Sequence, residues 1–156
     1  MKISTRGRYA LRMMLDIARH NGENKPVSLA SVSQRTGISH GYLEQVAIAL
    51  RSARLVRGVA GRHGGYKLAQ GAKEISIRQI IEATIGPVCV VDCIDEPEAC
   101  LRAEYCECRV VYAMINRRIG EVLDEFSLAD LADPQWLRET AKDFYTQLEG
   151  VGCGEI

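Results

Sequence analysis

Five of the six cysteines lie between residues 87 and 109, at positions 89, 93, 100, 106 and 108. Thiolates are soft ligands that suit zinc and iron–sulfur clusters. Six acidic residues lie between them, and the segment has a loop composition, so the sulfur atoms can converge. Acidic neighbours disfavour a bare thiolate, and a bound cation would offset that repulsion. The segment indicates a metal or cluster site, with a thiol redox switch or incidental cysteines as the alternatives.

The cysteine spacing is irregular, with three, six, five and one residues between successive members. It does not match the paired Cys-x2-Cys knuckles of zinc ribbons, so zinc is less favoured but stays open. Cys153 stands apart and is expected to be a free thiol in a flexible tail, 150–156. The polar start and the lack of a long apolar run predict no leader and no membrane span. These features and the cysteine usage predict a cytoplasmic protein.

Charge divides the chain into two halves. Residues 1–72 hold twelve Lys and Arg against three Asp and Glu, whereas residues 73–156 hold eight against seventeen. Such asymmetry is typical of a half that binds nucleic acid and a half kept away from it. A merely dipolar globule is the alternative.

The elements before the cysteines predict a winged helix-turn-helix. Helical periodicity covers 5–20, 29–36, 40–53 and 77–84, with Thr5, Ser28, Ser39 and Ser76 as expected N-caps. Gly37 lies in the turn between the second and third helices. The segments 55–59 and 66–69 flank a glycine-rich turn and predict a β-hairpin. The expected fold is mainly α, with one small hairpin.

The elements after the cysteines predict dimerisation. Residues 108–126 form a long amphipathic pattern whose apolar face is too wide for a small domain to cover, so a second copy of the chain is expected on it. A short turn at 128–131 and a last helix from Pro134 to about 148 follow. The expected division is a DNA-binding domain, 1–86, a cysteine-rich loop, 87–107, and dimerisation and C-terminal helices, 108–149.

Double-stranded operator DNA is the expected partner. The start of the third helix should enter the major groove, and the wing should reach phosphate or the minor groove. Gln can read adenine and Glu can accept from cytosine. The expected contacts are Ser28, Ser39, His40, Tyr42, Glu44, Gln45, Arg51, Arg62 and His63. The three histidines all lie in the basic half, 1–72, and none of them has an evident nucleophile nearby in the sequence. No catalytic constellation is visible, so an enzyme is not expected.

Four motifs together resemble a family of bacterial winged-helix iron–sulfur transcription regulators, which includes IscR-, NsrR- and CymR-like proteins. They are the first ten residues (MKISTRGRYA), Gly41-Tyr42-Leu43-Glu44-Gln45, Gly64-Gly65-Tyr66 and the segment 80–86. The resemblance runs from Met1 to about Leu131 and is greatest to the cluster-binding, IscR-like members. It implies a homodimeric regulator, of the repressor type, whose operator binding responds to iron or cluster status, oxidant or nitric oxide.

The resemblance implies that Cys93, Cys100 and Cys106 are cluster ligands, with [2Fe-2S] favoured over [4Fe-4S]. The fourth ligand departs from the family pattern. Arg109 stands where IscR-like proteins have histidine, and Arg8 where NsrR-like proteins have an acidic residue. The remaining candidates are Cys108, Cys89, a carboxylate such as Glu104 or Glu107, or an exogenous ligand. CymR-like members lack the cysteines.

The wing departs from the family pattern as well, because Ala60 replaces a frequent arginine. Arg62 is the expected substitute for the minor-groove contact. Two other functions stay open. One is a winged-helix regulator with a zinc or thiol-redox switch, and the other is an iron–sulfur carrier or electron-transfer protein.

Overall fold

A computed structural model describes residues 3–20 and 25–149. Its N-terminal body contains α1 (Thr5–His20), α2 (Leu29–Thr36), α3 (His40–Ser52) and α4 (Ile77–Ile85), with a hairpin of β1 (Val56–Val59) and β2 (Gly65–Leu68). The predicted winged helix-turn-helix is confirmed, and the helix boundaries lie within a residue or so of the expected ones. Residues 21–24, which follow the first helix, and the tail with Cys153 lie outside the described residues.

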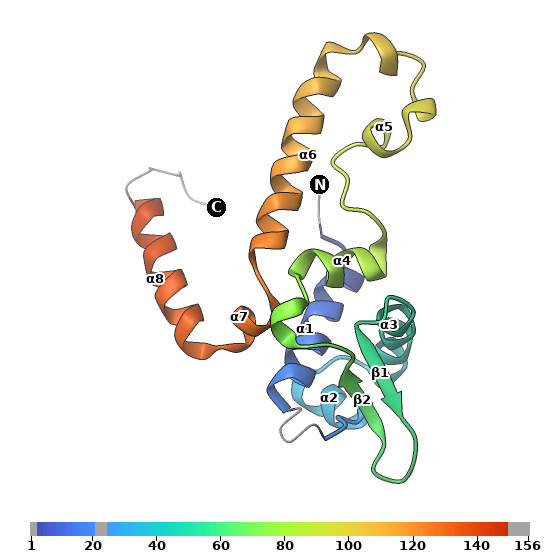
Figure 1. Cartoon of the computed structure of the whole chain (residues 1–156), viewed down its shortest axis with the longest axis vertical. Helices are drawn as coiled ribbons and strands as arrows, with labels where there is room; N and C mark the ends of the chain where they lie inside the picture. Colours follow the sequence, from blue (N-terminus) through green and yellow to red (C-terminus); the bar gives the residue numbers. More distant parts are fainter. Residues whose placement is uncertain (1–2, 21–24, 150–156) are drawn as a thin grey trace.

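The core lies where α1, α3 and α4 pack together, with the hairpin next to α1 and α3 (Figure 1). Apolar side chains at helical spacing supply it, so that each helix buries one stripe. Its fully buried large members include Met13, Met14, Ile17, Leu43, Leu50, Ile80 and Ile81. This packing fixes the angle of α3 relative to the rest of the body.

The wing is an antiparallel pair in which Val56 lies opposite Leu68 and Val59 opposite Gly65. Val27 and Tyr66 exchange backbone hydrogen bonds of 2.9 and 2.8 Å, which attach β2 to the segment before α2. A Cβ atom on Gly65 would lie 2.4 Å from the Val27 carbonyl oxygen. Glycine at this position therefore allows the wing to lie directly against the start of α2.

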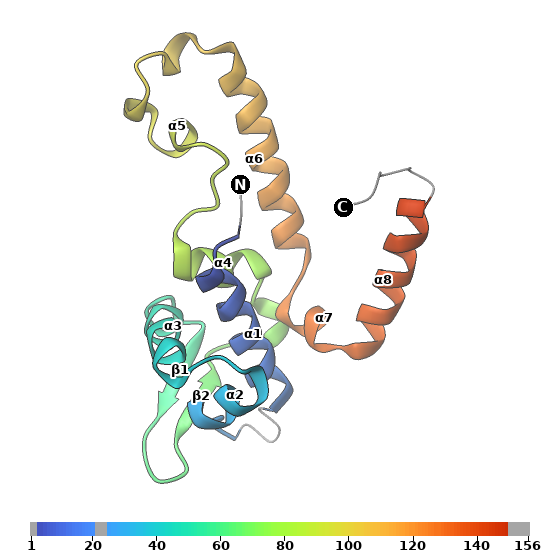
Figure 2. The same cartoon turned by 180° about the vertical axis from the view of Figure 1, so that it is seen from behind.

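Beyond the body, the chain forms a long excursion. The cysteine-rich segment leads to α6 (Glu107–Glu125), which runs back to the body, and both views show α6 extending well away from it (Figures 1 and 2). The segment is not a featureless loop. It contains α5 (Asp92–Asp95) and 3-10 turns η3 (Pro97–Ala99) and η4 (Ala103–Tyr105).

The base of α6 is joined to the body by backbone pairing. Ile77 N donates to Phe126 O at 3.0 Å, and Leu128 N donates to Ile75 O at 2.8 Å. Leu128 is fully buried in the core. Arg78 on α4 adds a hydrogen bond to Asp124 on α6 at 3.0 Å. The far end of α6 therefore projects from an anchored base.

Three local expectations are corrected. Residues 128–131 form a helix, α7 (Leu128–Ala132), because Ser127 and Asp130 complete a capping box. Ser4, not Thr5, caps α1, since its hydroxyl accepts from Gly7 N at 3.3 Å. Ser39 occupies the N-cap position of α3, but its side chain makes no capping hydrogen bond. The last helix, α8 (Pro134–Glu149), is as expected and stands apart from α6 in both views (Figures 1 and 2).

Candidate nucleic-acid interface and cysteine-rich loop

The turn that presents α3 is built from local hydrogen bonds. Ser28 caps α2 by accepting from Ser31 N at 3.2 Å. Gly37 ends α2 in the left-handed conformation, φ +72°, which glycine adopts without a Cβ penalty. Ser33 Oγ then donates to Ile38 O at 2.6 Å, closing the turn. The chain is thereby redirected into α3 at a defined angle.

The outer face of α3 carries several of the predicted DNA contacts. His40, Glu44 and Gln45 are exposed, and His40 Nδ1 lies 3.6 Å from Glu44 Oε1. Arg51 is also exposed, and eleven residues after His40 it returns to the same side of the helix. These polar side chains share the exposed side of α3 with the apolar side chain of Ile48.

Tyr42 differs from the other predicted contacts on α3. Its ring is half-buried and meets Tyr9 edge-on, with the ring centroids 5.4 Å apart. Such a pair stabilises the junction of α1 and α3. The described geometry therefore gives the Tyr42 ring a packing role, with only part of its surface left for a DNA contact.

Arg62 and His63 occupy the exposed tip of the wing. The turn is closed by Gly64 N donating to Gly61 O at 2.9 Å. Within the described residues, neither Arg62 nor His63 makes a hydrogen bond or ion pair. Two cationic or cation-forming side chains are thus available at the tip, as the sequence predicted.

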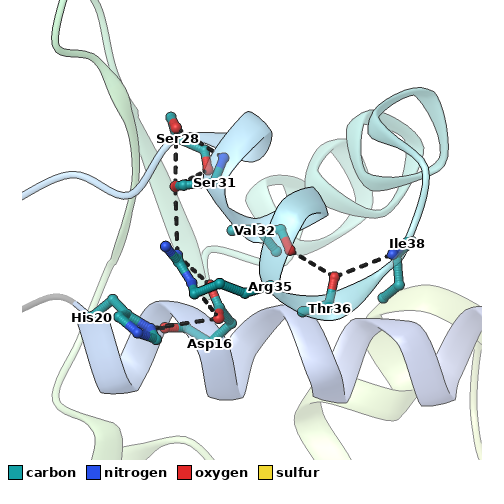
Figure 3. A network of polar contacts seen from close by, with 8 residues as sticks. All are labelled: Asp16, His20, Ser28, Ser31, Val32, Arg35, Thr36 and Ile38. Carbon is teal, nitrogen blue, oxygen red and sulfur yellow. Dashed lines mark hydrogen bonds and ion pairs between the residues drawn. The ribbon is translucent and has the colours of Figure 1, made fainter.

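A buried charge pair not predicted from the sequence ties α1 to α2 (Figure 3). Asp16 is 8% exposed and accepts from Arg35 at 2.8 Å from Nε and 2.6 Å from Nη2. The hydrogen bond to Asp16 raises the pKa of Arg35 above its ordinary value. His20 Nδ1 lies 2.8 Å from the Asp16 backbone oxygen and 3.5 Å from its carboxylate. The sequence signal that could have revealed this pair is Asp16 itself, a charged residue within the apolar stripe of α1.

The predicted ligands lie on successive turns of the cysteine-rich segment. Cys93 is in α5, Cys100 follows η3, and Cys106 immediately precedes α6. All three are half-buried and unpaired. Cys89 is also half-buried and donates from Sγ to Val91 O at 3.0 Å, whereas Cys108 is exposed in the first turn of α6.

The structure does not bring these thiols together. Over residues 3–20 and 25–149, no three His, Cys, Asp or Glu side chains are grouped so that they could hold a metal ion. The donor set nevertheless suits a soft metal or cluster in type, because three half-buried thiols lie on one short segment. The residues fit the group in their chemistry, and binding would require them to close together.

Arg109 has a structural role at the position where the resemblance implies histidine. Its Nε donates to Cys93 O at 3.1 Å, which attaches α5 to the start of α6. A groove of about 340 Å³ lies beside it, lined by Ile94, Glu104, Cys106, Arg109, Val110 and Ala113. The guanidinium cannot act as a ligand, and Arg109 instead holds the segment that contains Cys93 against the start of α6.

Two further hydrogen bonds connect the cysteine-rich segment to the helices on either side. Glu82 on α4 accepts from Val88 N at 3.1 Å, and Asn116 on α6 accepts from Val90 N at 3.0 Å. Since α4 also packs against α1 and α3, the segment is connected to the elements that position the DNA-binding helix.

The apolar face of α6 is open in the single chain. Met114 is 64% exposed, and Val110, Val111, Ile115 and Val122 are exposed as well. A groove of about 610 Å³ runs along this face, lined by Val111, Met114, Ile115, Arg118, Ile119, Val122 and Leu123. An exposed apolar surface of this kind is typical of an interaction site.

A helix-turn-helix with a wing, a polar face on its second helix and a cationic wing tip defines a DNA-binding transcription regulator. The sequence profile described as Rrf2, iron-dependent transcriptional regulator, matches residues 3–134. The chain belongs to the Rrf2 family.

Known proteins agree with this assignment. The chain is 39% identical to Protein rrf2 of Nitratidesulfovibrio vulgaris over 131 residues, which cover 84% of this chain and 87% of that protein. The solved structure of CymR, the global cysteine regulator of Bacillus subtilis, matches with a TM-score of 0.69 and 37% identity, covering 85% of this chain and 96% of that one. IscR of T. potens matches with a TM-score of 0.67 and 37% identity, covering 84% and 85%.

The relatives are named as regulators, which agrees with the expectation that the chain is not an enzyme. They include both IscR and CymR proteins, so the likeness by itself does not select an iron–sulfur cofactor. No helix in the described ranges is long and apolar enough to cross a bilayer.

Proposed function

We propose that the chain is a homodimeric regulator, acting in the cytoplasm as a repressor, whose operator binding is controlled by an iron–sulfur cluster on the cysteine-rich segment. The observation that carries the cluster is the set of three half-buried, unpaired thiols at Cys93, Cys100 and Cys106, on the segment that links α4 to α6. A bound cluster would supply a centre that responds to iron supply and to oxidants.

Dimerisation through α6 would place two DNA-binding bodies side by side. The open apolar face of α6 supports this arrangement, because water contact with Met114, Val111 and Ile115 would be lost against a second copy. Two recognition helices on successive major grooves must lie about 34 Å apart. The angle at which each α6 leaves its body would then set operator affinity.

DNA recognition would follow from the polar face of α3 and the wing. His40, Glu44 and Gln45 would lie in the major groove, where Gln45 reads adenine and Glu44 accepts from cytosine. Ser28, Ser39, the exposed part of Tyr42, Arg51, Arg62 and His63 complete the proposed contact surface. Phosphate contacts in the basic half would make affinity strongly salt-dependent.

Control would pass through the protein's own hydrogen bonds. Closing the three thiols together would pull on Cys93, whose carbonyl is held by Arg109, and on the segment held by Glu82 and Asn116. Each of these partners belongs to α4 or α6. Loading of the site would therefore shift the elements that orient the recognition helices.

The test is anaerobic purification with iron and sulfide analysis and a visible spectrum. Cys93→Ala, Cys100→Ala and Cys106→Ala should each lose the chromophore, whereas Cys153→Ala, at the sixth cysteine, should keep it and serves as the control. Cys108→Ala and Cys89→Ala examine the fourth ligand, and the band positions separate [2Fe-2S] from [4Fe-4S].

Operator binding is then measured with and without the cluster, using DNA selected from a random library. A colourless, iron-free protein that binds its selected DNA identically in oxidised and reduced buffer would refute cluster control. Zinc in stoichiometric amount, or a response to oxidant without iron, would indicate the zinc or thiol-switch alternative. Failure to select any DNA would refute the regulator itself.

A further inference from the structure

A polar pocket lies where the wing meets α1 and α2, away from the cysteine-rich segment. It has a volume of about 480 Å³ and takes His20 from the end of α1, Ser28, Ser31 and Arg35 from α2, and Arg62 and His63 from the wing. We propose that this wing pocket binds one phosphate group of the DNA backbone, and that the contact requires His20 to be protonated. The proposal rests on the DNA-binding function above and assigns a particular contact to it.

The charges around the pocket favour an anion. Two arginines and two histidines line it, and among the described residues its lining contains no carboxylate. The acid on these elements is Asp16, whose carboxylate accepts hydrogen bonds from Nε and Nη2 of Arg35. Arg35 therefore contributes little net charge, and Arg62 with the two histidines would supply the field that a phosphate meets.

The hydroxyl groups in the pocket are already committed to the protein. Ser31 Oγ donates to Ser28 O at 2.8 Å, and Ser28 Oγ donates to Ser31 Oγ at 3.0 Å (Figure 3). A phosphate oxygen needs donors that are not already used. Within the described chain, Arg62 and His63 make no hydrogen bond, so both are available at the rim.

His20 can donate to a phosphate in only one protonation state. Its Nδ1 lies 2.8 Å from the backbone oxygen of Asp16, and a carbonyl oxygen can only accept, so Nδ1 carries a proton. Nε2 of the neutral ring is then an acceptor, which a phosphate oxygen repels. Only the imidazolium presents Nε2–H, so binding at His20 takes up a proton when the ring is neutral beforehand.

The groups facing His20 agree with this coupling. The carboxylate of Asp16 lies 3.5 Å from Nδ1 and favours the charged ring, whereas Arg35, Arg62 and a charged His63 oppose it. A bound phosphate would neutralise that repulsion and hold the imidazolium. DNA affinity should then be higher at pH 6.0 than at pH 8.0, because protonation of the ring supplies the Nε2–H donor.

The test measures binding of a fluorescein-labelled 30-base-pair duplex of random sequence by anisotropy at pH 6.0 and pH 8.0, because a backbone contact does not depend on sequence. His20→Gln should weaken binding about tenfold at pH 6.0, the loss of one charge-assisted hydrogen bond, and have little effect at pH 8.0. At pH 6.0 its salt slope should be smaller by about 0.9, the value of one phosphate contact.

His63→Asn and Lys142→Gln complete the set. His63→Asn changes only an exposed side chain, so its folding is secure, and it should show a partial version of the same pH-dependent loss. Lys142→Gln removes one charge from exposed α8 and controls for net charge, so it should bind like the wild type at both pH values.

Equal affinity of His20→Gln, His63→Asn and the wild type at pH 6.0, in a wild-type protein that binds the duplex, would overturn the wing pocket alone. Absence of duplex binding by the wild type would instead overturn the proposed function. Inorganic phosphate is the second probe. If millimolar phosphate shifts the His20 ring resonances while His20→Gln leaves duplex binding unchanged, the pocket takes a free anion, and the DNA contact is refuted.

Discussion

Arg35→Met is the substitution that tests the buried charge pair most directly. It keeps an unbranched side chain on α2 but removes two charge-assisted hydrogen bonds to Asp16, of 2.8 and 2.6 Å. The Asp16 carboxylate, only 8% exposed, would keep the His20 ring, with Nδ1 3.5 Å away, as its remaining side-chain contact among the described residues. Removing one partner of a fully buried ion pair costs about 3–5 kcal/mol. Arg35 itself is 35% exposed and water reaches it, so we expect the lower end, about 3 kcal/mol.

The measurement is thermal or urea unfolding at equal protein concentration, where about 3 kcal/mol should lower the Tm by about 6–12 °C for a chain of this size. Arg117→Met is the matched control. Arg117 contacts Glu121 at the same 2.6 Å, but its side chain is 81% exposed. An exposed pair contributes about 0–1 kcal/mol. Equal destabilisation by the two substitutions would refute the argument that burial, and not bond length, decides the contribution.

Two further predictions concern caps and close contacts. Ser127→Ala should cost about 1 kcal/mol of stability near pH 7 through loss of the α7 cap. The hydrogen bonds from Ser127 lower the pKa of Asp130, so their contribution is present above the ordinary pKa of that carboxyl and is lost as the pH falls through the lowered value. Urea unfolding of the variant and the wild type should therefore converge in acid. Gly65→Ala would place a Cβ 2.4 Å from Val27 O, so the wing should separate from α2 and duplex affinity should fall. Gly58→Ala is the control, because it lies in the same hairpin but has open space at its Cβ. Equal affinities of the two variants would contradict the close contact.

Much of the fold could be predicted from the sequence, because local patterns dictate it. The apolar spacing of α1, α3 and α6 and the glycine-rich turn between the segments 55–59 and 66–69 are signals carried by residues close together in the sequence. The cap of α4 at Ser76 was predicted and is present, with Gln79 completing a capping box. α7 was missed because five residues are too few to show a helical period, although Ser127 and Asp130 carried a readable capping signal.

The candidate site was less predictable, because it depends on how elements pack. Asp16 and Arg35 are 19 residues apart, and their pairing follows only from the crossing of α1 and α2. The wing pocket likewise unites three segments. Arg109 was predicted only to be unable to ligate, and its bond to the Cys93 carbonyl requires the return path of the chain. The proposed convergence of the thiols would require a bound group, which no pattern in the sequence can place.

The anchored base of α6 gives this helix the mechanics of a lever. Backbone pairing at Ile75 to Leu128 fixes one end, and nineteen residues at 1.5 Å each make the arm roughly 28 Å long. A tilt of about 10° at the base would therefore sweep the far end through roughly 5 Å. Conversely, a displacement of several ångströms at the cysteine-rich end needs only a small rotation at the body. In the proposed mechanism, a chemical change at the tip would therefore tilt each α6 relative to its own body, while the buried core that fixes α3 stays intact.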